Sequence, residues 1–252
     1  MFLTYCCVDP SDLGVRVFRD SSTIAHMAWS VGPRLSLLSS GQGDAVPGGL
    51  MVVNDQSYDR SGGRPRRLME ECLYVCGLLE YSGIVCDFEQ PVRPMLEMFI
   101  RECAEGFRDL SVYVPERYAH CHGNTRILIP TALTSGSLPN RLREAVSQYG
   151  SDRVVLDMER TGRDLLLPNT DGPGAVLAFE DIPQMLAARG GTSFFSGELG
   201  ARYFTYKDEE ERTHFVIYDD YGTFRYKTEL ALQMGIREGF AVYPDMIGLG
   251  LL

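Results

Sequence analysis

The sequence predicts an α/β protein, a single (β/α)8 TIM barrel that occupies residues 1–252. Its length is that of an ordinary barrel of this kind. Short apolar segments alternate with amphipathic ones, a pattern that favours a parallel sheet covered by helices. Eight such apolar segments occur, which is the number of strands that a closed barrel needs.

The predicted elements follow from residue periodicity along the chain. The candidate strands are Phe2–Val8, Ile24–Val31, Leu50–Asn54, Gly83–Glu89, Ser111–Pro115, Ile127–Leu133, Arg153–Met158 and Gly239–Tyr243. The candidate helices are Arg66–Glu80, Arg93–Phe107, Leu138–Tyr149, Phe179–Arg189 and Thr223–Met234.

Two regions break the alternation. Residues 34–49 are rich in Ser and Gly and predict a ribbon that extends from the second strand. Residues 162–218 predict an elaboration between the seventh and eighth strands. Within it, Arg202–Tyr206 and His214–Tyr218 flank the charged turn Lys207–Glu211, which is typical of a β-hairpin with a solvated tip. No repeat or linker divides the chain.

Charge and composition limit the partners. A net charge of −10 argues against nucleic acid, whose affinity comes largely from Lys and Arg, and fits a neutral or sugar-like ligand. No segment approaches the ~18 apolar residues of a membrane span. The N-terminus reads as a first strand rather than a signal peptide, and seven cysteines indicate reduced thiols, so a cytoplasmic protein is expected. The oligomeric state stays open.

The cysteines and histidines predict neither a metal nor a cofactor. Cys72 and Cys76 lie one helical turn apart, which is typical of two small core residues. The run His120-Cys121-His122 contains metal-ligand types. No second Cys/His cluster completes the four ligands of a structural zinc site.

A pair of carboxylates ends the fourth candidate strand. The apolar run Ile84–Phe88 predicts a buried strand, and strand side chains alternate, so Asp87 and Glu89 point the same way. Like charges this close raise one proton affinity, which supplies a neutral acid near neutral pH. Alternatively, either acid caps the helix that starts near Val92, or pairs with Arg93.

Further polar residues follow other strands. In a barrel of this kind the site lies at the C-terminal ends of the strands. Asp157 and Glu159 repeat the Asp-x-Glu spacing on the seventh strand, where a buried ion pair with Arg160 or Arg163 is the alternative. Tyr243 and Asp245 lie at the end of the eighth strand.

The fourth strand resembles that of glycoside hydrolase family 18, the chitinase-like barrels. The family reads Asp-Gly-x-Asp-x-Asp-x-Glu, followed by an aromatic residue and Pro; the same register holds Ser82, Gly83, Val85, Asp87, Glu89 and Pro91. Residues 214–223 and 235–243, with Lys227, resemble the family's closing hairpin, last helix and eighth strand. The similarity is greatest to bacterial spore-cortex and germination-type glycosidases.

The resemblance implies a substrate-assisted retaining mechanism on β-linked N-acetylglucosamine-containing glycans, a muropeptide or a chitooligosaccharide. Glu89 would protonate the glycosidic oxygen and later activate water. Asp87 would orient the substrate's acetamide, whose oxygen attacks the anomeric carbon to form an oxazolinium ion. Glu89 starts protonated, and Asp87 helps to keep it so. A spore-associated location also becomes an expectation beside the cytoplasm.

The sequence departs from the family at three places. Val85 replaces an Asp, residues 127–134 lack the family's Tyr-Asp that holds the acetamide, and Tyr243 replaces a Trp that forms the sugar floor. Tyr5, Tyr113 or Glu159 are the side chains that could replace the missing Tyr. Trp29 is the only Trp, so a processive chitinase is not expected.

These departures leave other hypotheses open. The first is a catalytically impaired barrel that binds a glycan or a protein. The second is a different hydrolytic chemistry, in which Glu89 and Glu159 act as acid/base and nucleophile about 5–5.5 Å apart. A divalent metal held by Asp87, Asp157 and Glu159 is a third.

Overall fold

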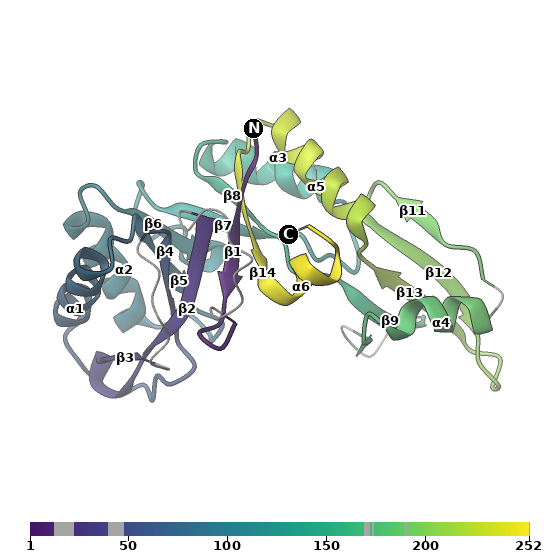
Figure 1. Cartoon of the computed structure of the whole chain (residues 1–252), viewed down its shortest axis with the longest axis horizontal. Helices are drawn as coiled ribbons and strands as arrows, with labels where there is room; N and C mark the ends of the chain where they lie inside the picture. Colours follow the sequence, from purple (N-terminus) through teal and green to yellow (C-terminus); the bar gives the residue numbers. More distant parts are fainter. Residues whose placement is uncertain (13–22, 40–47, 169–171, 173, 190, 252) are drawn as a thin grey trace.

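The chain forms a closed barrel of eight parallel strands from which a second, five-stranded sheet projects (Figure 1). The computed structural model describes residues 1–12, 23–39, 48–168, 172, 174–189 and 191–251. The barrel strands are β1 (Leu3–Val8), β2 (Ile24–Val31), β4 (Leu50–Asn54), β5 (Gly83–Asp87), β6 (Ser111–Pro115), β7 (Arg126–Pro130), β8 (Val154–Asp157) and β14 (Glu238–Val242). Pairing of β1 with both β14 and β2 closes the barrel. The predicted fold class is confirmed, and all eight predicted strands are present.

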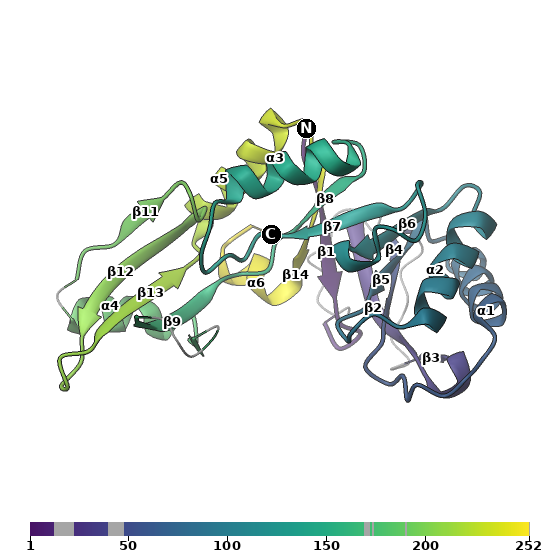
Figure 2. The same ribbon diagram turned by 180° about the vertical axis from the view of Figure 1, so that it is seen from behind.

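Helices cover only part of the barrel. They are α1 (Pro65–Leu78), α2 (Pro94–Gly106), α3 (Leu138–Tyr149), α5 (Tyr221–Gln233) and α6 (Tyr243–Gly248). Figure 2 shows α1 and α2 side by side on the outside of the sheet, opposite α3 and α5. Between β6 and β7 the chain forms only the short 3-10 helix η3 (Glu116–Tyr118). No helix among the described residues has the length and apolar character needed to cross a bilayer.

Side chains fill the barrel interior. The buried interior set is Tyr5, Ala25, Leu50, Val52, Val85, Tyr113, Val155 and Phe240. The ring of Tyr5 stacks on Phe240 at 5.0 Å between centroids, and Tyr113 meets the same ring edge-on at 5.2 Å. Below them, Glu238 pairs with Arg126 at 2.6 Å and accepts a hydrogen bond from the Tyr113 hydroxyl. The interior is therefore a packed core that supports whatever lies at the open end.

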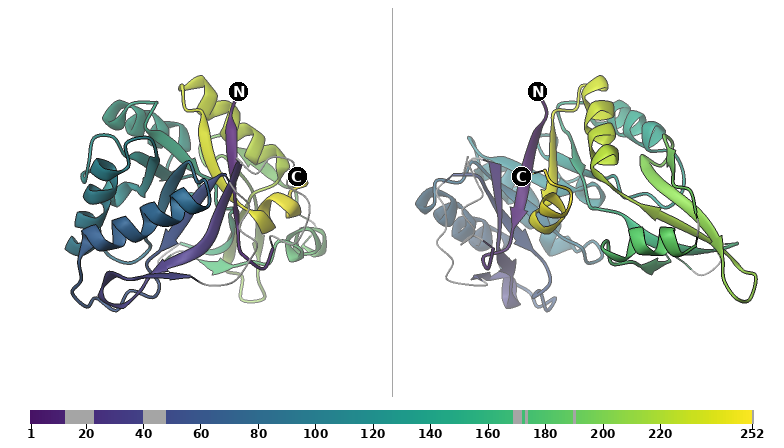
Figure 3. Two further views of the ribbon diagram at one scale, coloured as in Figure 1. Left: turned by 60° about the vertical axis from the view of Figure 1, so that its left-hand side comes forward. Right: turned by 45° about the vertical axis from the view of Figure 1, so that its right-hand side comes forward.

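The elaboration forms an antiparallel sheet with the order β10-β9-β13-β12-β11. Its strands are β9 (Gly162–Leu167), β10 (Ala175–Val176), β11 (Phe194–Ser196), β12 (Ala201–Lys207) and β13 (Thr213–Tyr218). The predicted hairpin is present as β12 and β13, and helix α4 (Asp181–Ala188) packs on one face of the sheet (Figure 3). The ribbon predicted after the second strand is present as β3 (Leu37–Ser39), antiparallel to β2; residues 40–47 lie outside the described part.

A buried ion pair joins this sheet to the barrel. Lys227 of α5 is fully buried and donates to the Asp219 carboxylate at 2.9 Å. Asp219 also accepts the Thr161 backbone N–H at 2.8 Å and the Thr223 hydroxyl at 2.7 Å. Because Thr161 precedes β9, the network fixes the point at which the chain leaves the barrel.

One boundary differs from the prediction at a position that matters for the site. The eighth strand ends at Val242, and Tyr243 begins α6 instead of closing the strand. Pro244 explains the change, because proline is favoured in the first turn of a helix and cannot extend the strand's hydrogen bonding.

Candidate functional site

A cavity of about 610 Å³ lies at the C-terminal ends of the barrel strands. Barrel strands supply its apolar floor, which includes Val52, Val85, Leu128 and Phe240. The start of β9, the strand β10 and the residues before α4 supply another wall, through Gly162, Val176 and Phe179 among others. The barrel and the projecting sheet therefore build the cavity together.

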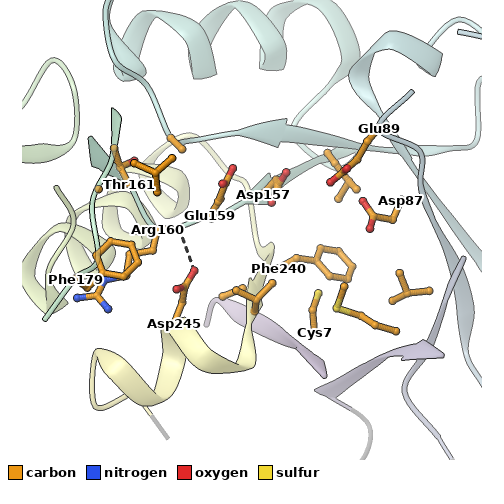
Figure 4. Close-up of a pocket in the computed structure, with 18 of the residues that line it drawn as sticks. Cys7, Asp87, Glu89, Asp157, Glu159, Arg160, Thr161, Phe179, Phe240 and Asp245 are labelled. Carbon is orange, nitrogen blue, oxygen red and sulfur yellow. Dashed lines mark hydrogen bonds between the residues drawn. The ribbon is translucent and has the colours of Figure 1, made fainter. Parts of the chain in front are cut away.

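Four carboxylates from two strands line this cavity. Asp87 ends β5 and Glu89 follows it, while Asp157 ends β8 and Glu159 follows it; Figure 4 shows the two pairs along one side of the cavity. The structure thus brings these four predicted residues together. Within the described part of the chain, none of their side chains has a hydrogen bond or an ion pair.

The alternative interpretations of these acids are not realised in the described residues. Helix α2 has Arg93 at its N-cap and no side-chain cap, so neither acid of the first pair caps it. Arg160 stacks on the Phe179 ring at 3.7 Å and does not form an ion pair with either acid of the second pair, Asp157 and Glu159. The carboxylates are therefore left facing the cavity.

Burial raises the pKa of two of the four. The pKa of Asp87 rises to about 6, first because of burial and then because of the charges of Glu89 and Asp55, against which Arg117 acts. The pKa of Asp157 also rises to about 6, through burial and the charges of Glu159, Asp87 and Glu89. Both carboxyls can therefore exchange a proton near neutral pH, as general acid–base chemistry requires.

Core packing aims the first pair. Phe88 is fully buried, and its ring meets Phe99 at 6.2 Å and Tyr118 at 5.8 Å. Successive side chains of an extended chain point to opposite sides. Since Phe88 is anchored between the barrel and its helices, Asp87 and Glu89 are directed into the cavity.

Two predicted binding residues lie away from the cavity walls. Tyr5 is in the barrel interior beneath the cavity, and Tyr243 is packed in the cluster between the barrel and its helices. Alternation along β14 explains this, because Phe240 faces inward while Ala241 and Tyr243 face outward. Phe240 is thus the aromatic ring at the floor, and a contact of Tyr5 or Tyr243 with substrate stays a prediction.

Sequence reasoning missed lining residues such as Phe179 and Cys7, whereas Asp245, predicted at the end of the eighth strand, does line the cavity. Phe179 was assigned to a helix, whereas α4 begins at Asp181 and Phe179 reaches the cavity wall. Asp245 of α6 accepts the Arg160 backbone N–H at 3.2 Å. The thiol of Cys7 also lines the floor, and burial raises its pKa well above its usual value.

The His-Cys-His run is divided between two environments. Glu97, His120 and Cys121 bring their donor atoms within 4.8 Å of one another, the one such group among the described residues. Glu97 and His120 already pair at 2.7 Å, and the His122 ring accepts the Asn124 N–H at 3.2 Å. The set considered from the sequence, Asp87, Asp157 and Glu159, does not converge in this way.

At the level of sequence, neither a family model nor a curated protein matches the chain. Solved structures do match it. The spore cortex-lytic enzyme SleL of Bacillus megaterium is 15% identical, with a TM-score of 0.64 over 96% of this chain and 70% of that one. A class V chitinase of Pseudomonas fluorescens is 12% identical, with a TM-score of 0.68 over 96% and 95%. A family GH18 chitinase of Cycas revoluta, solved with (GlcNAc)4, is 13% identical, with a TM-score of 0.60 over 96% and 94%.

These likenesses extend over nearly the whole chain, including the projecting sheet. At such low identity they establish the architecture and leave the chemistry to the site itself. The resemblance predicted from the fourth strand is therefore confirmed at the level of fold: the chain folds as the chitinase-like barrels of glycoside hydrolase family 18 do.

Proposed function

We propose that this protein is a glycosidase that hydrolyses β-linked N-acetylglucosamine-containing glycans with retention of configuration. The observation that carries the proposal is the pair Asp87 and Glu89, unpaired in the described structure and directed into a cavity at the end of the fourth barrel strand. The pair occupies the last two acidic positions of the motif that the family carries there.

The mechanism assigns one role to each acid. Glu89, protonated, donates to the glycosidic oxygen as the bond breaks, and then as a carboxylate removes a proton from the attacking water. Asp87, ionised, accepts the acetamide N–H, aligns the acetamide oxygen with the anomeric carbon and stabilises the positive oxazolinium ion. Asp157 and Glu159 accept hydrogen bonds from sugar hydroxyl or amide groups.

The substrate is a short glycan. A cavity of about 610 Å³ suits a few sugar units rather than a long polysaccharide, and Phe240 and Phe179 offer apolar ring surface to sugar faces. A muropeptide or a chitooligosaccharide meets these demands. The likeness to a spore cortex-lytic enzyme supports a bacterial, spore-associated setting. Neither nucleic acid nor a membrane is a proposed partner.

A second candidate is a barrel that binds a glycan without cleaving it. The observation that favours it is Val85, which is buried in the apolar interior where the family has an Asp. Asp87 therefore lacks the carboxyl beneath it with which the family's acid pairs. A binding protein would keep the cavity and lose the turnover.

Fluorophore release from 4-methylumbelliferyl N-acetylglucosamine oligosaccharides separates the two candidates. Wild type, Glu89→Gln and the exposed control Glu209→Gln are compared from about pH 4 to about pH 8. Release by wild type and control but not by Glu89→Gln supports the glycosidase. Thermal stabilisation of all three by the sugars, with no release from any, supports the binding protein.

A further inference from the structure

The backbone that carries Glu89 is held by a buried carboxylate from the neighbouring strand. Asp55 directly follows β4 and is fully buried. Its Oδ1 accepts the Glu89 N–H at 3.0 Å, and its Oδ2 accepts the Gln90 N–H at 3.2 Å. The Gln90 side-chain amide donates to the Asp55 carbonyl at 2.7 Å. Both oxygens of one side chain are thus used on two successive peptide groups.

The carbonyl groups of the same two residues, Glu89 and Gln90, are held from the other neighbouring strand. Arg117 lies on η3, which follows β6, and its Nη1 donates to the Glu89 carbonyl at 2.8 Å and to the Gln90 carbonyl at 3.3 Å. Since β5 lies between β4 and β6, one charged side chain from each neighbour grips the chain where it leaves the barrel.

Burial of Asp55 calls for an explanation. A carboxylate removed from water is costly unless it is hydrogen-bonded or paired, and Asp55 has no ion-pair partner among the described residues. Its two N–H contacts are what it gains. An Asn would serve less well, because its amide NH2 would face one of the two backbone N–H donors.

We propose that Asp55 is a positioning residue, which with Arg117 fixes Glu89 at the distance from the glycosidic oxygen that proton transfer requires. The inference rests on the proposed glycosidase function. Displacement of a reacting group by about 1 Å costs on the order of 100-fold in rate. Three contacts determine the place of Glu89: the Phe88 ring in the core, Asp55 on the amides and Arg117 on the carbonyls.

Asp55 also acts on its neighbour through its charge. The charged and titratable groups around Asp87 are Cys7 of β1, Asp55 after β4, Glu89, Arg117 of η3 and Asp157 of β8. Asp55 is among the charges that raise the pKa of Asp87. Loss of that charge therefore lowers the pH at which Asp87 ionises.

The test compares Asp55→Asn with Asp59→Asn, an equal charge loss in the same loop at an exposed side chain that hydrogen-bonds Ser61 and does not touch Glu89 or Gln90. We expect Asp55→Asn to lower kcat about 10- to 100-fold while KM changes less than about threefold, since the substrate-binding walls are untouched. The acidic limb of the pH–rate profile moves to lower pH. The control keeps wild-type kinetics and profile.

A second variant guards against misfolding of the first. Arg117 is exposed, so Arg117→Gln should fold, and we expect a fall in kcat of about tenfold; Arg66→Gln, on the outer face of α1, is its control. Amide hydrogen exchange at Glu89 and Gln90 reports the grip directly and should accelerate in Asp55→Asn.

The outcomes are distinct. Faster exchange with unchanged kcat and pH profile overturns the positioning role while the glycosidase stands. If wild type shows no turnover, but exchange at Glu89 and Gln90 is still faster in Asp55→Asn, the glycosidase function is refuted. The role of Asp55 in holding this backbone is then supported. Slow exchange in both Asp55→Asn and wild type overturns the inference.

Discussion

At the scale of single residues, the site is built at the expense of stability. Asp87 and Asp157 are mostly buried, yet neither side chain has a hydrogen bond or an ion pair within the described structure. A solvated carboxylate would lose nothing of this kind. The raised pKa values reflect the free-energy cost of burying the charged carboxylates. Measuring stability as a function of pH therefore compares the protonated with the ionised form.

Asp157→Asn should stabilise the fold at alkaline pH. The pKa of Asp157 is raised from 3.8 to about 6, so the folded state binds more protons than the unfolded state between these values. Stability therefore falls as pH rises through this window, by up to about 3 kcal/mol. We expect urea unfolding at about pH 8 to show a gain of about 1–3 kcal/mol for Asp157→Asn, and almost none at about pH 3.5. The exposed control Asp109→Asn should show no such difference between the two pH values.

His26 should produce the opposite slope. It is buried beside Tyr81, neither ring nitrogen has a hydrogen-bond partner among the described residues, and burial lowers its pKa from 6.5 to about 4. As the pH is lowered below 6.5, the unfolded state binds a proton at His26 before the folded state does. The free energy of unfolding therefore decreases as the pH is lowered from 6.5 to about 4, by at most about 3 kcal/mol. As the pH is lowered across this window, the free energy of unfolding of His26→Leu should increase relative to that of wild type, because the variant has no titrating group at this position. A constant difference would contradict the lowered pKa.

Single residues also show what the sequence could and could not predict about the site. The sequence alone could predict the four cavity carboxylates, because each Asp-x-Glu pair lies at the end of an apolar strand: Asp87, Glu89, Asp157 and Glu159. Asp55 could not be predicted in this way, since its partners lie more than thirty positions away and only the pairing of β4 with β5 brings them together. Phe240 could also have been predicted. With the eighth strand ended at Val242 instead of Tyr243, alternation along β14 places Phe240 on the inward face.

At the scale of elements, buried strands were the easier prediction. A buried parallel strand is a largely apolar run, and such runs mark the barrel strands, although His26 and Ser30 interrupt the run in β2. The edge elements carry mixed residues instead. In β9, Asp164 has the polar character of a loop residue, but it accepts a hydrogen bond at 2.7 Å from the Tyr206 hydroxyl of β12 and lies 2.9 Å from the His214 ring nitrogen of the adjacent β13. Cross-strand partners decide such a strand, and a linear pattern does not contain them.

The link between α5 and β9 should fail when one partner is removed. Lys227→Met leaves the Asp219 carboxylate buried without its cation, and removal of one partner of a buried pair costs about 3–5 kcal/mol. We expect that loss in urea unfolding, and a smaller one for the double variant Lys227→Met/Asp219→Asn. A double variant no more stable than Lys227→Met would show that the charge of Asp219 is not the cause.

At the scale of the whole molecule, the cavity is a joint product of two sheets. The barrel presents the carboxylates, and the projecting sheet with its flanking segments presents the opposing wall (Figure 4). The sequence predicted each part, but not that Phe179 and the start of β9 would meet the ends of β5 and β8. That juxtaposition depends on the direction in which β9 leaves the barrel, which the Lys227–Asp219 network fixes.

Division of labour between the two parts predicts a split in kinetics. Phe179 lines the cavity and stacks on Arg160, but it is not one of the carboxylates to which the proposed reaction assigns a role. Phe179→Ala removes ring surface that would pack on a sugar, a loss of about 1 kcal/mol that corresponds to roughly a fivefold to tenfold rise in KM. We expect kcat to stay within about twofold, because Glu89 and Asp87 keep their supports in the barrel. Phe194→Ala, on the exposed edge strand β11, is the matched control and should change neither constant. An equal fall in kcat for Phe179→Ala would mean that the projecting sheet also orders the acids, and that the barrel alone does not hold the reactive geometry.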